Sequence, residues 1–296
     1  MVQYIKDSSN VFRRRRRRET PREFGAASPQ DFKTAKKPGK TISSNHVLLE
    51  RRKEKFLIFR MNNLDNFKPN NGKNLVIDLT ADGKWARLPM KTHVIAKDDN
   101  IVEVVKRYAK PHLLNGDILF VSERIVAISQ GRAFPIKDIK PSFLAKFLVK
   151  FVHKSPYGIG LGSPWTMELA IKEGGVLRII IGALAAAITK PFGIKGVFYK
   201  VVGRNINAID GPCDYTLPPY NEYAKLGPAE PEKVAKKLKS VINHDVVIID
   251  ANDLGVAVLG KSNKDISDVF CKSVFKDNPL GQSSEQTPLC IVRKIY

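Results

Sequence analysis

Apolar residues recur three or four positions apart in several stretches of the chain. The stretches are Ile101–Tyr108, Phe143–Phe151, Pro231–Ile242 and Ile266–Phe270. This repeat places side chains on one face of an α-helix and therefore predicts four helices. A fifth is indicated by Ser163-Pro164, because serine favours the cap position and proline the first turn.

Short apolar runs bounded by turn residues predict the strands of the fold. These runs are Asn74–Thr80, Ile118–Val121, Val246–Ile249, Val256–Leu259 and Leu289–Ile295. Strands and helices are mixed without a regular strand–helix–strand alternation. The pattern therefore predicts the α+β class, with mixed sheets and packed helices.

The longest apolar run, Ile179–Thr189, directly follows Arg178. It is too short to cross a bilayer, which takes about 20 apolar residues. Two interpretations stay open: a buried helix, or a helix that dips into a membrane interface. We expect no membrane span and a soluble, cytoplasmic protein.

The net charge of +21 is spread unevenly over the 296 residues. Residues 1–55 hold 16 Lys and Arg against 6 Asp and Glu, a net charge of +10 that includes the run Arg13–Arg18. Such a run can bind nucleic acid or anionic lipid, or direct the chain to a compartment. Low apolar periodicity favours a disordered basic tail over residues 1–55, followed by one folded domain over 56–296.

Histidine and cysteine spacing argues against zinc and disulfides. The five histidines show no paired spacing, so a zinc site is not indicated. The three cysteines (Cys213, Cys271 and Cys290) are odd in number and far apart, which points to a reducing compartment.

Carboxylates in two turn-rich segments are the candidate metal ligands. Asp210 and Asp214 lie in the segment Asn205–Glu222, and Asp250 and Asp253 follow the predicted strand that ends at Ile249. Mg²⁺ and Mn²⁺ prefer such oxygen ligands. The alternative is that these aspartates only stabilise turns, which is their usual role.

Glycines and cations nearby predict an anion site. Gly158, Gly160 and Gly162 precede a predicted helix, whose N-terminus favours phosphate. Cations that can hold phosphate oxygens are Lys195, Lys200 and Arg204. A flexible structural loop and a solvated basic face are the alternatives, and they stay open.

The segment Lys91–Arg132 resembles the N-terminal block of the coenzyme F420-0:γ-glutamyl ligases. The residues at that family's motif positions are Gly116-Asp117, Arg124-Ile125-Val126 and Gln130-Gly131-Arg132. Ala208–Pro212 and the Asp250 region resemble its two metal-binding loops. Three positions depart from the family pattern: Arg124 replaces a lysine, Cys213 an asparagine, and Ala251 a serine or threonine.

The resemblance implies a ligase that joins L-glutamate to an acceptor carboxylate through an acyl phosphate, with GTP as co-substrate and Mg²⁺ or Mn²⁺ as cofactor. It implies that Asp210 and Asp250 hold the metal, and that Asp214 or Asp253 replaces the metal ligands that the departures remove. It also implies that Lys195, Lys200 and Arg204 bind phosphate, and that Arg124 and Arg132 bind substrate. Glu168 is a weaker candidate for a residue of this site. The family also implies a homodimer.

Three alternatives remain at this point. The base can be GTP or ATP, and the acceptor can resemble F420-0 or a folate. The chain can also be a non-catalytic protein that binds nucleic acid or an anionic surface, in which case the basic tail carries that binding. No aromatic pattern of an RNA-binding sheet accompanies the basic residues.

Overall fold

The computed structural model describes residues 67–79, 82–152, 159–194, 196–203, 205–252 and 255–295. The predicted basic tail over residues 1–55 and the domain boundary after it lie outside the described residues, so both stay predictions.

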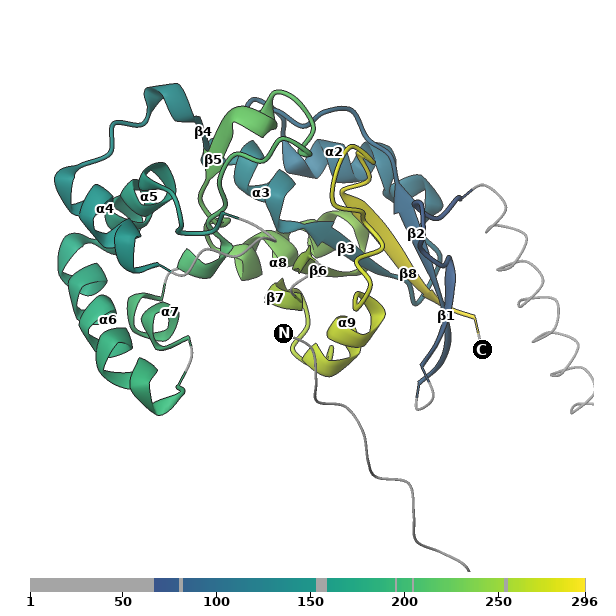
Figure 1. Cartoon of the computed structure of the whole chain (residues 1–296). Helices are drawn as coiled ribbons and strands as arrows, with labels where there is room; N and C mark the ends of the chain where they lie inside the picture. The colour runs from purple at the N-terminus through teal and green to yellow at the C-terminus, as the bar shows by residue number, and fades with distance from the viewer. Residues whose placement is uncertain are drawn as a thin grey trace, which may run out of the picture. The chain divides into compact units, whose positions relative to one another are not determined.

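A six-stranded mixed sheet organises the fold (Figure 1). Its strands stand in the order β1-β2-β8-β3-β6-β7. The only parallel pair in that order is β3 with β6, and the other neighbours are antiparallel. The strands are β1 (Val76–Leu79), β2 (Gly83–Met90), β3 (Ile118–Ser122), β6 (Asp245–Asn252), β7 (Gly255–Lys261) and β8 (Leu289–Lys294).

Helices cover both faces of this sheet, which confirms the predicted α+β class. One apolar core lies between the sheet and α2 (Ile101–Tyr108), α3 (Glu123–Ser129) and α8 (Pro231–Ile242). A second core, on the other face, includes residues of α9 (Asp268–Val274). In this second core the rings of Phe120 and Phe275 stack at 4.5 Å.

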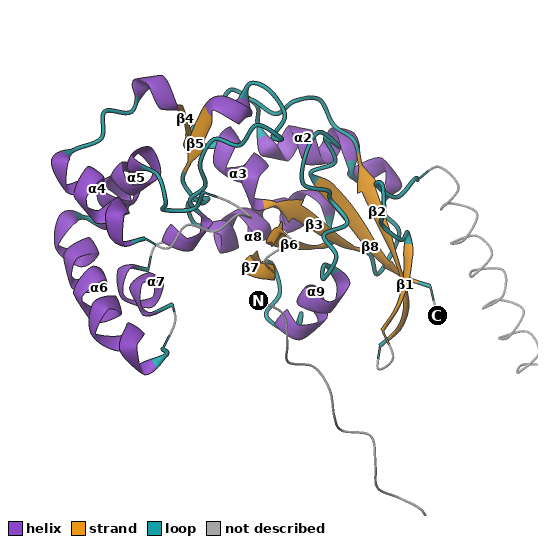
Figure 2. Ribbon diagram, in the orientation of Figure 1, coloured by secondary structure: helices purple, strands orange, loops and turns teal. Residues whose placement is uncertain are grey.

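A third core belongs to a helical region (Figure 2). It is built by α4 (Phe143–Leu148), α5 (Pro164–Gly174), α6 (Val176–Thr189) and α7 (Val197–Val202), together with residues beside the short pair β4 (Ala133–Pro135) and β5 (Tyr223–Lys225). The two short strands pair antiparallel as a second sheet.

Local sequence explains where several helices begin. The Ser163 hydroxyl accepts a hydrogen bond from the Thr166 amide at the start of α5, and the Thr166 hydroxyl accepts one from the Ser163 amide. This capping box satisfies donors that a helix start leaves open. Helix α8 begins at Pro231, as predicted, and buries Leu238 and Ile242.

The helix predicted over Ile179–Thr189 forms, but it is not a buried helix. Only Ile179 and Gly182 of α6 are buried among its fourteen residues, and most of its large apolar side chains are exposed. Within the described residues, none of the helices is both long and apolar enough to cross a membrane.

Candidate functional site

Strands β3 and β6 run parallel, with Ser122 opposite Ile249, so their carboxyl ends meet at one edge of the sheet. Glu123 and Arg124 follow β3 directly, and Asp250 lies near the end of β6. Polar groups at the carboxyl ends of parallel strands line the usual ligand crevice of open sheets. The sheet therefore brings these three side chains together.

The acidic loop reaches the same edge through a backbone bridge. The Asp210 amide donates to the Lys225 carbonyl at 3.1 Å, and the Lys225 amide donates to the Asp210 carbonyl at 2.9 Å. Gly211 is needed there for close packing, since a Cβ atom on it would lie 2.9 Å from the Ile159 Cγ2 atom. The loop is therefore more than a free surface turn.

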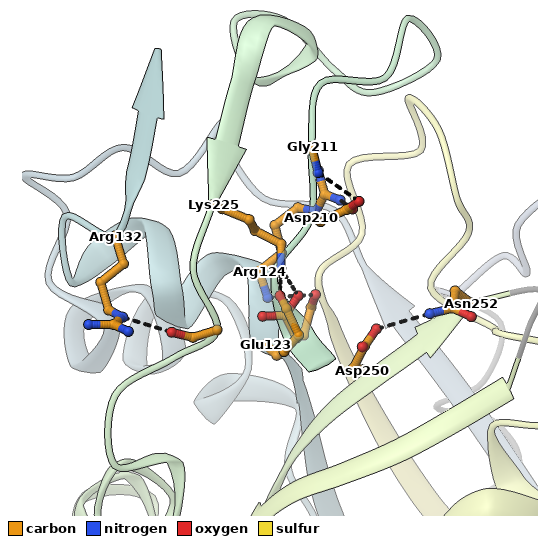
Figure 3. Close-up of polar contacts among 11 residues, drawn as sticks. Glu123, Arg124, Arg132, Asp210, Gly211, Lys225, Asp250 and Asn252 are labelled. Atoms are coloured by element: carbon orange, nitrogen blue, oxygen red, sulfur yellow. Dashed lines mark hydrogen bonds and ion pairs between the residues drawn. The ribbon is translucent and has the colours of Figure 1, made fainter. Parts of the chain in front are cut away.

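Lys225 connects the loop to the end of β3 (Figure 3). Its Nζ atom lies 2.5 Å from the Glu123 Oε1 atom and donates to the Ala208 carbonyl at 2.8 Å. The Lys225 and Glu123 side chains are only 7% and 6% exposed. The Glu123 Oε2 atom is buried and has no hydrogen-bond partner among the described residues.

A second ion pair lies beside the first. The Arg124 Nη2 atom is 2.7 Å from the Asp210 Oδ2 atom, and the Gly211 amide donates to Asp210 Oδ1 at 2.9 Å. Asp250 has a weaker contact, because the Asn252 amide approaches its Oδ1 atom at 3.4 Å. Three carboxylates thus face two cations, which leaves an excess of one negative charge.

Burial changes the acidity of two groups in this cluster. Burial raises the pKa of Glu123 to about 7; Lys225 opposes the shift, and the like charge of Asp250 adds to it. Burial also raises the pKa of Asp250, opposed by Lys225 and supported by the charge of Asp210. Burial therefore outweighs the nearby cations at both carboxylates, and raised pKa values of this kind are common at functional sites.

A cavity of about 420 Å³ opens over this cluster. Its size falls within the range of small-molecule sites. Four parts of the chain line much of it: the cluster itself, the segment after β2 that includes His93, one side of the helical region that includes Tyr199, and a loop over residues 278–288. That loop supplies Asn278, Gln282, Ser283 and Glu285. A cavity with mixed polar and apolar lining above buried charges suits a charged ligand that also has an apolar part.

The structure brings together some of the site residues that were predicted from the sequence. Arg124, Asp210, Asp250 and Gly160 all line the cavity. The others that the structure describes do not line it: Asp214, Gly162, Lys200, Arg132 and Glu168. Gly158, Lys195, Arg204 and Asp253 lie outside the described residues.

The nominated residues away from the cavity have other contacts. The Gly162 amide donates to the Ile159 carbonyl at 2.7 Å. Arg132 lies 2.9 Å from Glu173 Oε1 and donates to the Gly227 carbonyl, and Glu168 accepts from the Ser142 hydroxyl. Asp214 and Lys200 are exposed. The roles predicted for these residues stay predictions.

Glu123 and Lys225 were not nominated from the sequence. Glu123 directly follows an apolar strand and precedes Arg124, so its position was a usable signal. Lys225 gives no comparable signal, because it stands in a three-residue strand and reaches Glu123 only through long-range pairing.

Comparison with protein families identifies the chain. The family model for F420-0:Gamma-glutamyl ligase matches residues 89–266, a range that includes the whole charged cluster. The chain belongs to the F420-0:gamma-glutamyl ligase family. A comparison with curated proteins gives no significant match. The family is one of ligases, and its matched range ends before the cavity loop over residues 278–288.

The residues at the cavity of this ligase-family protein fit a hard divalent cation. Asp210 and Asp250 line the cavity with carboxylate oxygens, and the buried Glu123 Oε2 atom has no hydrogen-bond partner among the described residues. No group of three or more acidic, histidine or cysteine side chains that could hold a metal is present among the described residues. Mg²⁺ does not need one, because it usually binds one or two carboxylates together with substrate phosphates and water.

Proposed function

We propose that the protein is a metal- and GTP-dependent γ-glutamyl ligase that joins L-glutamate to an acceptor carboxylate. The observation that carries the proposal is the position of Glu123, Arg124, Asp210, Lys225 and Asp250 around one cavity, within the residues that match the ligase family. The acceptor is a small molecule with a free carboxylate, of the F420-0 type.

The reaction proceeds in two transfers. The acceptor carboxylate oxygen attacks the γ-phosphorus of GTP, a new P–O bond forms, and GDP leaves. The glutamate amine then attacks the acyl carbon, the C–N bond forms, the C–O bond to phosphate breaks, and the amine loses a proton. Both steps move negative charge between oxygens, so groups that neutralise this charge lower the barrier.

The residues of the cluster divide these tasks. Asp210 and Asp250 would hold one or two Mg²⁺ or Mn²⁺ ions, which neutralise phosphate charge when bound. Arg124 presents a planar donor pair suited to a carboxylate or phosphate. Lys225, held by Glu123, supplies a fixed positive charge below them. Arg124 would exchange Asp210 for a substrate oxygen when the ligands enter.

The loop over residues 278–288 is the part of the cavity best placed to select the acceptor. It lies beyond the residues that match the family, and its lining side chains are mostly uncharged and polar. A ligase with the family's charged cluster can therefore accept a different carboxylate, such as a folate-like molecule. ATP in place of GTP is the corresponding alternative for the nucleotide.

Two further expectations belong to this proposal. A homodimer is expected from the family resemblance. Binding to nucleic acid through the basic tail alone is the competing, non-catalytic function. The buried Glu123–Lys225 pair beside the cavity favours the ligase, since a protein that binds only through its surface has no need of it.

A mass-spectrometric assay tests the ligase. The full chain is given Mg²⁺ or Mn²⁺, GTP or ATP, L-glutamate, and a panel of F420-0 and folates. Asp210→Asn is compared with Asp214→Asn, a matched change in the same loop at an exposed carboxylate outside the cavity. We expect a product heavier by one glutamyl unit, lost in Asp210→Asn and kept in Asp214→Asn. Equal loss in both variants, or no product with any acceptor, would contradict the proposal.

A further inference from the structure

Helix α6 carries an exposed apolar stripe on the side that faces away from its neighbours. The stripe consists of Leu177, Ile181, Leu184 and Ile188, spaced four, three and four residues apart, which places them on one side of a helix. Leu177 is 71% exposed and Ile188 is 67% exposed. A helix side that faces only water usually carries polar residues, so these large apolar side chains indicate another contact.

The opposite side of α6 is already packed. A Cβ atom on Gly182 would lie 2.8 Å from the Val202 Cγ2 atom and 3.3 Å from the Phe198 ring, so α7 approaches the α6 backbone closely at this position. Ile179, on the same side, is fully buried. Figure 1 shows α6 at the outer edge of the helical region, with α7 on its inner side. The exposed fractions of the four residues of the stripe place them on the side away from this packing.

The apolar surface continues beyond the helix. Phe192 and Ile194, which follow α6, are 79% and 53% exposed. Helix α4 and the turn after it expose three aromatic rings in the same helical region: Phe143, Phe147 and Phe151. Isolated exposed apolar residues are ordinary, but a series of this length marks an interaction surface.

The segment that carries α6 and α7 has charges of one sign. Residues 174–209 contain five Lys and Arg and no Asp or Glu. Arg178, Lys190 and Lys200 are exposed there, and so are Lys146 and Lys150 near the aromatic rings of α4. An apolar stripe with these exposed cations as its border fits a partner that has an apolar interior and a negatively charged surface.

We propose that this surface docks the protein on an anionic membrane, with α6 lying in the plane of the headgroups. A helix of 14 residues is about 21 Å long, too short to cross the hydrocarbon core. Apolar side chains on one side and cations at the border are the features of helices that lie at the interface. Each cation adds attraction to anionic lipid headgroups.

Charge argues against the two other occupants. A second copy would place the same basic border opposite itself, and like charges repel. The segment of this chain outside the described residues, 1–66, holds 17 Lys and Arg against 7 Asp and Glu, so it has the same sign as the surface. Only a negative partner complements both the stripe and its border.

The test uses sedimentation of the full chain with vesicles of mixed phosphatidylglycerol and phosphatidylcholine, or of phosphatidylcholine alone. The variant changes Leu177→Ser, Leu184→Ser and Ile188→Ser together. Val269→Ser on α9 is the matched control, because Val269 is 73% exposed outside the helical region. A second variant changes Arg13–Arg18 to serine and isolates the contribution of the tail.

We expect the α6 variant to lose at least tenfold in binding to the anionic vesicles, with an unchanged melting temperature. We expect the tail variant and Val269→Ser to keep most of the binding to the anionic vesicles. Binding of the wild type should weaken on phosphatidylcholine alone and in about 0.5 M NaCl, where charges are screened within a few ångströms. Absence of vesicle binding, or equal binding by the α6 variant, would overturn the proposal. Loss of a concentration-dependent dimer in the α6 variant, without vesicle binding, would assign the surface to a second copy instead.

Discussion

The cavity and the helical region use charge in opposite ways. At the cavity, Lys225 and Arg124 are paired with carboxylates, and Lys225 is almost fully buried. Around α6, the cations Arg178, Lys190 and Lys200 are exposed, and residues 174–209 contain no acidic residue. Paired charges below a cavity suit the binding of small charged ligands. Exposed cations without nearby carboxylates suit the binding of a large, negatively charged partner.

Breaking the buried pair should give the largest effect on stability. Lys225→Met leaves Glu123 without its cation in an almost fully buried position. Loss of one partner of a buried pair typically costs about 3–5 kcal/mol. Urea unfolding measures the change. Lys106→Met is the control, since it removes a solvent-exposed pair with Glu103, for which we expect less than about 1 kcal/mol.

The double variant Lys225→Met with Glu123→Leu sharpens this result. It removes both buried charges, so the free energy of unfolding should recover most of the loss. A double variant as unstable as Lys225→Met alone would show that packing, and not charge, causes the effect.

The pH dependence of stability should come next in size. The pKa of Glu123 is raised by burial from 4.5 to about 7, so the folded state favours the protonated carboxyl. This stabilisation is complete below pH 4.5 and is lost as the pH rises through 7, by up to about 3 kcal/mol. Unfolding in a chelator from pH 5 to 8 measures it. The slope should flatten in Glu123→Gln, and an unchanged slope would assign it to another group.

Crowding the contact between α6 and α7 should have a moderate effect. Gly182→Val places atoms where Val202 and Phe198 already lie, and overpacking of this kind costs about 1–3 kcal/mol. Ala187→Val, at an exposed position of the same helix, should cost about 0.5 kcal/mol or less. Thermal unfolding measures the loss of stability in the two variants. Equal losses would contradict the close packing of α6 against α7.

The exposed stripe should contribute least to folding. Leu184 is 60% exposed, so Leu184→Ser should change the free energy of unfolding by no more than about 0.5 kcal/mol. Leu238→Ala, in the fully buried face of α8, should cost about 2–5 kcal/mol. Chemical denaturation distinguishes the two. A large loss for Leu184→Ser would mean that the stripe packs against something within the protein.

Local patterns predicted much of the fold correctly. The Ser163-Pro164 pair and Pro231 predicted the first residues of α5 and α8 correctly, because such start signals act within one helical turn. Strand β2 was not predicted. It contains the fully buried Arg87, whose charge is balanced by Asp277 far along the chain, and no local pattern shows such a partner.

The same distinction holds for the site. Asp210, Asp250 and Arg124 were found from turn residues, strand ends and the family resemblance, and the structure places all three at the cavity. Lys225 was missed because its role depends on a backbone bridge to Asp210 and on burial beside Glu123. Residues whose chemistry depends on long-range pairing need the folded structure.

The central claim is that the cavity is a metal-dependent nucleotide site. Calorimetric titration of GTP into the full chain, with Mn²⁺ or with a chelator, tests it most directly in wild type and in Asp250→Asn. We expect Mn²⁺ to raise the affinity for GTP at least tenfold in the wild type and to have little effect in the variant. Equal affinity with and without the metal, or an unchanged metal effect in Asp250→Asn, would contradict the claim.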